Sequence, residues 1–353
     1  MVKSKTLKLV LDGSGSYLGM EKGCLTLKNQ KGELKKYPLF EDEIGEVILK
    51  SGNAVSTSAL ASMGFWGIDA LIVTQRGKPV AMLKSIDDDG HVSQRIAQYE
   101  ALNNGKGLSI AKQIVLGKTS GENLVLRKYG LRQHDLASVK RKIEQIDTTD
   151  LKVLRRTLLP IEGSCSDFYF SQVLTLFSHS MQKTDKRRTF RAYDGLNNAL
   201  NFAYELLKWK VHVALINAKL EPFLGFMHCE EAGKPSLACD MMELYRHLVD
   251  DFLIQYSRSV QRKDFVVKSE KYVSGKIGKR EYLSDSRAND LMRRFYAYLD
   301  CKVQIPRIRH GYKSSIETLI NEEALLLGMY LRNETKNWIP RISIAHGLIY
   351  SSM

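Results

Sequence analysis

The chain has 353 residues, 44% hydrophobic and 26% charged, a composition that excludes a disordered or collagen-like protein. Its 53 Lys and Arg exceed its 39 Asp and Glu, but residues 1–90 hold 12 basic and 11 acidic side chains while residues 91–353 hold 41 and 28. Five scattered cysteines exclude a disulfide scaffold, and no apolar run reaches the ~18 residues of a membrane span, so we expect a cytoplasmic protein without membrane contact.

The first part of the chain is typical of short strands. β-Rich segments and one short helix alternate with glycine-containing turns, and the elements are expected at 7–11, 24–27, 35–39, 47–49, 56–66 (the helix), 68–73 and 79–83.

From residue 93 onward, apolar residues recur every three or four positions, which indicates helices. These are expected at 95–117, 121–146, 150–158, 164–180, 196–213, 237–257, 286–299 and 315–331. The sequence therefore predicts an α+β protein. A small, mostly-β N-terminal domain (1–86) is followed by a linker (87–92) and a larger all-α catalytic domain (93–353).

The basic surplus of the second domain forms several dense spots with tyrosine and phenylalanine among them, at 183–191, 258–263, 268–280, 293–294 and 307–313. Basic and aromatic side chains together favour nucleic acid as the ligand. The alternative is a solvated lysine-rich surface without a partner. A membrane surface is less favoured, because no basic amphipathic anchor is present.

Two apparent motifs fail on spacing. Gly117-Lys118-Thr119 ends like a phosphate-binding loop, but Lys112 stands where that loop needs its first glycine. His228, Cys229 and Cys239 lack the spacing of a zinc site.

Three segments place a polar ligand in apolar surroundings. Glu162 precedes a predicted helix, His228 ends an aromatic loop, and Asp240 and Glu243 lie three residues apart on one helical face. Two carboxylates on one face repel each other unless a cation lies between them, and Arg246 could be that cation. Each segment could instead have a purely structural role. Glu162 could interact with the dipole at the start of a helix, His228 could be a core residue, and the carboxylates of the third segment could form a salt bridge.

Taken together, Glu162, His228 and Asp240 offer two carboxylates and one imidazole. This ligand set suits Mg²⁺ or Mn²⁺ in an octahedral site, and Mn²⁺ tolerates the nitrogen better. Because the protein supplies only a few ligands, other coordination positions remain open to water, as phosphodiester chemistry requires.

Four blocks of sequence then occur in a characteristic order, at 52–79, 161–170, 194–204 with 222–228, and 235–246. With these blocks the chain resembles the CRISPR-associated adaptation integrases, the metal-dependent DNA endonucleases that insert new spacers into CRISPR arrays. The likeness covers nearly the whole chain. Two departures are Lys219, where the family's loop usually has glycine, and His247, where a proline is usual.

The resemblance implies metal ligation by Glu162, His228 and Asp240, with Glu243 in place of a second acid that assists catalysis. It implies attack of a spacer 3′-hydroxyl on a phosphodiester, and double-stranded and branched DNA as substrates. It also implies a homodimer joined through the β domains, and a small ferredoxin-fold adaptation protein as a partner. Two alternatives stay open: a stand-alone metal-dependent nuclease that acts on branched DNA in repair, and a non-catalytic DNA-binding scaffold.

Overall fold

The computed structural model describes residues 7–11, 14–39, 44–75, 77–85, 90–181, 184, 186–190, 192–271, 277–304, 314–344 and 349–350. The chain divides into two compact units, Met1–His91 and Val92–Met353. Part of the expected linker, Asp87 to Asp89, lies outside the described residues, and Gly90 already begins helix α2 (Gly90–Glu100).

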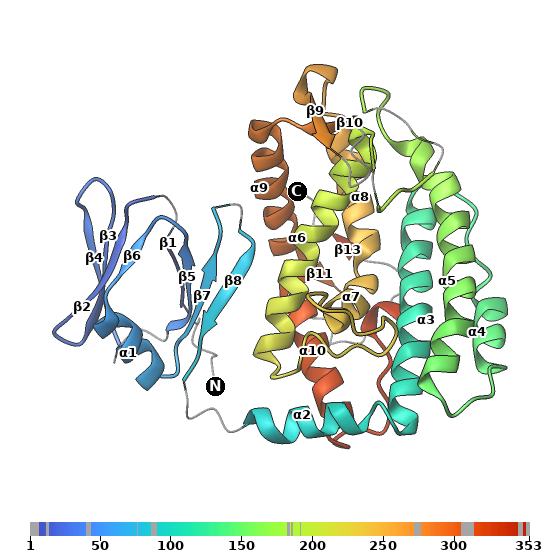
Figure 1. The fold of residues 1–353 in the computed structure, drawn as a ribbon, viewed down its shortest axis with the longest axis horizontal. Helices are drawn as coiled ribbons and strands as arrows, with labels where there is room; N and C mark the ends of the chain where they lie inside the picture. The colour runs from blue at the N-terminus through green and yellow to red at the C-terminus, as the bar shows by residue number, and fades with distance from the viewer. Residues whose placement is uncertain are drawn as a thin grey trace. The chain divides into compact units, whose positions relative to one another are not determined.

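Unit 1 contains two four-stranded sheets (Figure 1). One has the order β1-β5-β7-β8, with β1 (Leu7–Leu11), β5 (Ile44–Lys50), β7 (Asp69–Val73) and β8 (Pro79–Leu83). The other has the order β4-β3-β2-β6, with β2 (Tyr17–Glu21), β3 (Cys24–Lys28), β4 (Leu34–Pro38) and β6 (Ala54–Val55). Leu18 and Leu25 of the second sheet share one apolar core with Val47 and Leu49 of the first.

The predicted strands of unit 1 are confirmed, and β2 and β6 are additions. β2 pairs with β3 in a hairpin whose turn residues, Lys22 and Gly23, both have positive φ (47° and 77°), as the right-handed strand twist favours in two-residue turns. The predicted helix is α1 (Thr57–Phe65), which Ser56 caps by accepting a hydrogen bond from the backbone N–H of Ala59.

Unit 2 is built around one large apolar core of helices. The long helices are α3 (Gly105–Lys128), α5 (Leu151–Val173) and α6 (Gly195–Asn217). The others are α4 (Leu136–Glu144), α7 (Ser236–Glu243), α8 (Arg246–Ser257), α9 (Asp285–Asp300) and α10 (Ile316–Leu331). Helix α3 packs against α5 and α8, and α6 packs against α7, α8 and α10.

The α+β fold class is confirmed, but several details of unit 2 differ from the expectation. It is not all-α, since it contains the hairpin β9 (Phe265–Lys271) and β10 (Ile277–Leu283) and a small sheet of β11 (Lys302–Gln304), β12 (Ser314–Ser315) and β13 (Ile349–Tyr350). Helix α5 continues through Pro160, because Leu158 and Tyr169 on either side are buried and packing outweighs the lost backbone hydrogen bond. The helix expected at 237–257 is two helices, α7 and α8.

Among the residues that the structure describes, no helix combines the length and apolar character that crossing a bilayer requires.

Candidate metal and DNA site

Asp240 of α7 is completely buried and receives hydrogen bonds from the loop that ends at His228. Its Oδ2 accepts from the backbone N–H groups of Phe226 (2.5 Å) and Met227 (2.9 Å). Its Oδ1 accepts from the backbone N–H of His228 (2.8 Å) and lies 2.7 Å from Nδ1 of that ring. A carboxylate has about four lone-pair positions. All four of Asp240 are therefore used inside the protein, and the carboxylate orders the loop.

Arg155 of α5 binds the carbonyl side of the same loop. This buried guanidinium donates from Nε to the Phe226 carbonyl (2.8 Å) and from Nη2 to the Gly225 carbonyl (2.6 Å). A Cβ at Gly225 would lie 2.9 Å from Oδ2 of Asp240, so only glycine allows the loop to approach α7 this closely. Arg155 and Asp240 thus bind the loop through its carbonyl groups and its N–H groups, respectively.

The imidazole of His228 is oriented by this arrangement. Since Nδ1 faces Asp240, Nε2 is the nitrogen that can bind a metal ion or exchange a proton, and 28% of the side chain is exposed. Burial alone would lower the pKa of His228, but the carboxylate of Asp240 outweighs it and raises the pKa above its ordinary value. Histidines that bind metals commonly have such a carboxylate behind the ring.

Glu162 of α5 and Glu243 of α7 meet at a second point, the buried ammonium group of Lys118 in α3. Lys118 Nζ contacts Oε1 of Glu162 and lies 2.9 Å from Oε2 of Glu243. Glu243 Oε1 accepts a hydrogen bond of 2.8 Å from Arg246, and Ser166 donates one of 3.1 Å to Glu162. Three helices thus bring two carboxylates to one cation.

The charges at this point are strongly coupled. Burial opposes ionisation of Glu243, but Arg246 and Lys118 outweigh it and hold its pKa far below the ordinary value. Burial likewise lowers the pKa of Lys118, yet Glu243 and Glu162 raise it overall to about 12. Glu243 is therefore an anion and Lys118 a cation at neutral pH.

The predicted site residues thus form two neighbouring groups, His228 with Asp240 and Glu162 with Glu243. Glu243 is close enough to His228 for each to shift the pKa of the other. Within the described residues, no three His, Cys, Asp or Glu side chains are already arranged to hold a metal ion. The chemistry of the donors nevertheless fits a divalent cation. Two carboxylates converge, one of them bound to a cation on each oxygen, and Nε2 of His228 forms no hydrogen bond within the described residues.

Sequence reasoning missed Lys118 and Arg155. Lys118 was considered only as part of a phosphate-binding loop, and it lies in the middle of α3 instead. Its signal was available, because a lysine among Ile110, Ile114 and other buried residues of one helix must find acidic partners. Arg155 carries no comparable signal, since two of its partners are backbone carbonyls and its acidic partner, Glu230 (3.2 Å), lies 75 residues along the chain.

Two further titratable groups are buried in α8. His247 packs against Gly121 of α3, and neither ring nitrogen makes a hydrogen bond within the described residues. Burial lowers the pKa of His247 to about 3. Asp250 accepts hydrogen bonds from the hydroxyls of Tyr169 (2.9 Å) and Tyr204, and burial raises its pKa to about 6.

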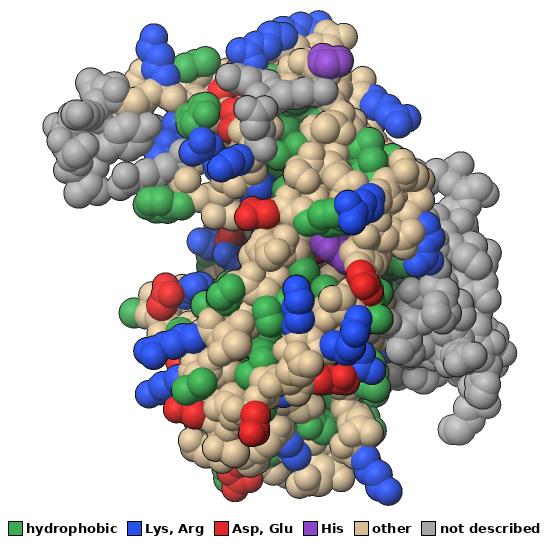
Figure 2. All heavy atoms as spheres, turned by 90° about the vertical axis from the view of Figure 1, so that its right-hand side faces the viewer, with side chains coloured by type: hydrophobic (Ala, Val, Ile, Leu, Met, Phe, Trp, Pro, Cys, Tyr) green, Lys and Arg blue, Asp and Glu red, His purple; other side chains and the backbone are tan. Residues whose placement is uncertain are grey.

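Basic side chains occupy many exposed positions of unit 2. Figure 2 shows Lys and Arg side chains distributed across one face, with acidic ones between them. Exposed basic residues of α4, α5 and the segment before α4 are Arg132, Lys140, Arg141, Lys142, Lys152 and Arg156. Such a distribution suits the repeated phosphates of a nucleic acid backbone.

Comparisons with known proteins identify relatives over most of the chain. The family model described as CRISPR associated protein Cas1 matches residues 9–287. The CRISPR-associated endonuclease Cas1 of Korarchaeum cryptofilum is 29% identical over 286 residues, 76% of this chain and 82% of the relative. The CRISPR-associated endonuclease Cas1 1 of Pyrobaculum aerophilum is 31% identical over 268 residues, 73% of this chain and 84% of the relative.

Solved structures share the fold. A casposase bound to integration product has a TM-score of 0.69 at 20% identity and covers 97% of this chain and 99% of its own. A chain of a partial Cas6-RT-Cas1–Cas2 complex has a TM-score of 0.70 at 20% identity, with coverages of 95% and 98%. A CAS1 protein from Thermotoga maritima has a TM-score of 0.65 at 21% identity, with coverages of 92% and 97%.

Proposed function

The chain belongs to the CRISPR associated protein Cas1 family, and from that premise we propose that it inserts spacer DNA into CRISPR arrays by metal-dependent strand transfer. The prediction of a CRISPR-associated endonuclease is confirmed by the family match and by the names of the relatives. The metal, the site residues and the partners are proposals.

We assign the metal to Glu162, His228 and Glu243. Two observations support this set: Glu162 and Glu243 converge on one point, and Nε2 of His228 is the available nitrogen of a ring held from behind. Asp240 would act as a positioning residue, because its four hydrogen bonds leave no oxygen lone pair for a metal. This assignment departs from the expectation that Asp240 binds the metal directly.

A divalent cation bound there, Mg²⁺ or Mn²⁺, would polarise the scissile phosphate and stabilise the charge that develops on it. The residues around it have separate tasks. Asp240 and Arg155 hold the loop and the ring of His228, which can ligate the metal or donate a proton to the leaving oxygen. Lys118 and Arg246 keep Glu243 ionised. Exposed basic side chains would bind phosphates on either side, so DNA affinity should fall steeply with salt.

Double-stranded and branched DNA are the proposed substrates, and a small ferredoxin-fold adaptation protein is the proposed partner. The fold neighbours include a casposase with its integration product and a complex that contains Cas1 and Cas2. A homodimer formed through unit 1 is also proposed. In that unit Phe65 is 83% exposed and Trp66 44% exposed, side by side at the end of α1.

The decisive experiment is transfer of a labelled short duplex into supercoiled plasmid in the presence of Mn²⁺, with and without the small adaptation protein. Glu162→Gln, Glu243→Gln and His228→Ala should each abolish joining while melting curves confirm folded protein. Glu231→Gln is the matched control, because Glu231 is an exposed acid of the same region whose ion pair is with the neighbouring Lys234.

Each rival gives a different result. A repair nuclease would cut branched DNA without the adaptation protein and insert nothing when it is added. A non-catalytic scaffold would bind DNA, and none of the three substitutions would change the products. Joining by the folded variants would show that these residues are not the site.

A further inference from the structure

Arg246, which binds Glu243, also contacts an aromatic ring of another helix, that of Tyr204 in α6. Its Nη1 donates a 2.8 Å hydrogen bond to Oε1 of Glu243, while Oε2 lies 2.9 Å from Nζ of Lys118. Its guanidinium lies 4.3 Å from the centroid of the Tyr204 ring. Tyr204 is buried and only 18% of the Arg246 side chain is exposed, and a cation–π contact is stronger when little water surrounds it. Arg246 thus fixes which oxygen of Glu243 faces Lys118 and Glu162, and Tyr204 limits where Arg246 can lie.

The ring of Tyr204 is itself held by its hydroxyl group and by a second cation. The hydroxyl donates a hydrogen bond to Oδ1 of Asp250, one helical turn after Arg246 in α8. Tyr169 of α5 donates to the other oxygen of Asp250 (2.9 Å), so this carboxylate is fixed as well. The guanidinium of Arg187 lies 5.2 Å from the centroid of the Tyr204 ring. Because Asp250 attracts both guanidinium groups, it offsets the repulsion between Arg187 and Arg246 beside one ring.

Arg187 is bound to the same side of α6 as Tyr204. It donates from Nη1 to Oδ1 of Asn197 (3.0 Å) and from Nη2 to Oδ1 of Asn201 (2.6 Å). Asn197, Asn201 and Tyr204 follow one another at spacings of four and three residues, so their side chains share one side of the helix. The ring of Tyr204 is therefore held from three directions, by α6 itself, by α8 and by the segment that carries Arg187.

We propose that Tyr204 is a positioning residue for the metal site: its ring holds Arg246 against Oε1 of Glu243, so that Oε2 stays directed at the point where Glu162 converges. This inference rests on the proposed function, because it needs Glu243 as a metal ligand. Replacing a residue that orients a metal ligand typically changes metal affinity about 10- to 100-fold. If Tyr204 only filled the core of unit 2, its replacement would lower the melting temperature without such a change.

The test measures the Mn²⁺ affinity of the full chain by calorimetry, without DNA, for two substitutions of Tyr204. Tyr204→Leu removes the aromatic face and should weaken Mn²⁺ binding about tenfold. Tyr204→Phe keeps the face and loses only the hydroxyl group, so its affinity should stay within about threefold of the parent affinity. Equal Mn²⁺ affinities of these two variants would overturn the proposal.

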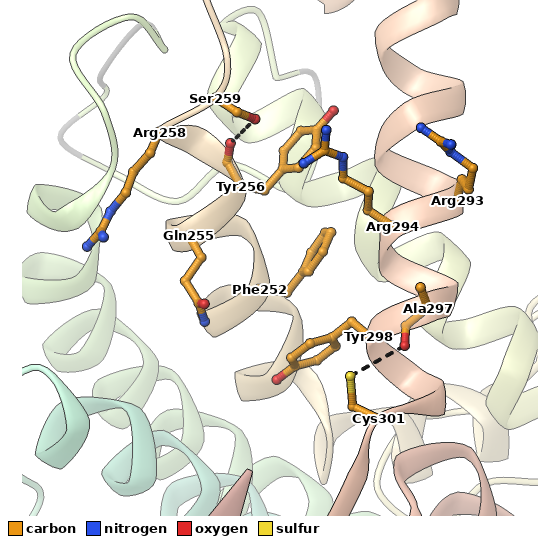
Figure 3. Close-up of a pocket in the computed structure, with 10 residues that line it drawn as sticks. All are labelled: Phe252, Gln255, Tyr256, Arg258, Ser259, Arg293, Arg294, Ala297, Tyr298 and Cys301. Atoms are coloured by element: carbon orange, nitrogen blue, oxygen red, sulfur yellow. Dashed lines mark hydrogen bonds between the residues drawn. The ribbon is translucent and has the colours of Figure 1, made fainter. Parts of the chain in front are cut away.

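Phe252→Leu is the matched control for damage to the core of α8. Phe252 is buried two residues beyond Asp250, a rotation of about 200° around the helix, so the two side chains lie on opposite sides. Its ring packs against Phe295 and Tyr298 of α9, with centroids 5.3 and 5.4 Å apart, beside a cavity of about 760 Å³ (Figure 3). Phe252→Leu should lower the melting temperature and leave Mn²⁺ affinity unchanged. A loss of affinity equal to that of Tyr204→Leu would mean that general damage to α8 explains both, and would overturn the proposal.

A double-mutant cycle shows whether Tyr204 acts through Arg246. In an Arg246→Met background the guanidinium is gone, so Tyr204→Leu should change Mn²⁺ affinity by less than about twofold. The same loss from Tyr204→Leu in both backgrounds would refute an action through Arg246. The proposed function is tested separately by Glu243→Gln: Mn²⁺ binding that this variant leaves unchanged would overturn the metal assignment, and this inference with it.

Discussion

Replacing His247 with leucine should make unit 2 less sensitive to mild acid. The imidazole is buried against Gly121, neither ring nitrogen forms a hydrogen bond to another part of the chain that the structure describes, and burial lowers its pKa. The folded protein therefore keeps this ring neutral, whereas the unfolded chain takes up a proton near the ordinary pKa. Stability from this neutral ring is complete above that value and is lost as pH falls.

The magnitude follows from the two pKa values, 6.5 in the unfolded chain and about 3 in the folded protein. Each pKa unit corresponds to about 1.4 kcal/mol, so the full effect is about 5 kcal/mol. Most of this free energy would be lost only below pH 5. Between pH 8 and pH 5, the free energy of unfolding should decrease by about 2 kcal/mol through this group alone.

Urea titrations at pH 8 and pH 5 measure this difference, followed by tryptophan fluorescence. A Trp66→Phe background leaves Trp209 and Trp338, which both report unit 2. Asp250 contributes with the opposite sign, but it is present in every protein compared and its effect cancels. His247→Leu should lose about 2 kcal/mol less than the parent over this interval.

His247→Gln provides a second variant that is uncharged at both pH values, in case leucine does not fit beside α3. The reasoning is refuted if either folded variant loses as much stability as the parent between pH 8 and pH 5. That result would mean that the ring is protonated in the folded protein.

Four further predictions concern single positions. Lys118→Met should lower the melting temperature but tighten Mn²⁺ binding, measured calorimetrically, because the ammonium group of Lys118 no longer competes with the metal for the carboxylates of Glu162 and Glu243. Weaker binding would contradict this. Gly121→Ala should destabilise the protein, since its Cβ would lie 2.4 Å from Nδ1 of His247, and adding His247→Ala should recover part of the loss in a double-mutant cycle. As the pH rises from 4 to 6, the parent protein should lose about 2 kcal/mol of stability through Asp250, because its folded pKa of about 6 exceeds the ordinary 3.8, and Asp250→Asn should remove this loss; an unchanged urea midpoint profile would refute it. Lys219→Gly should stabilise the protein by about 0.5–1 kcal/mol in urea titrations, because Lys219 directly follows Ala218, the C-cap of α6, and has a φ of 63°.

Local features of the chain were predictable because they depend on near neighbours. Helix and strand periodicity determined the two kinds of unit, and the spacing of Asp240 and Glu243 placed both on one helix. The unusual Lys219 could be noted from sequence, and its left-handed backbone explains why glycine suits that position. Helix ends were less predictable: Pro160 lies inside α5 because tertiary packing outweighs local preference.

The roles of the site residues depended on contacts between distant segments. Asp240 and Glu243 are one helical turn apart, yet Asp240 receives the loop at 226–228 while Glu243 meets Lys118 of α3. The local sequence offered Arg246 as a cation near the two carboxylates, but nothing in it showed that the lone pairs of Asp240 are all used by the loop while Glu243 faces Lys118 as well as Arg246. That difference arises from which helices pack together, because burial forces each charge to find a partner, and the partners are brought by other parts of the chain.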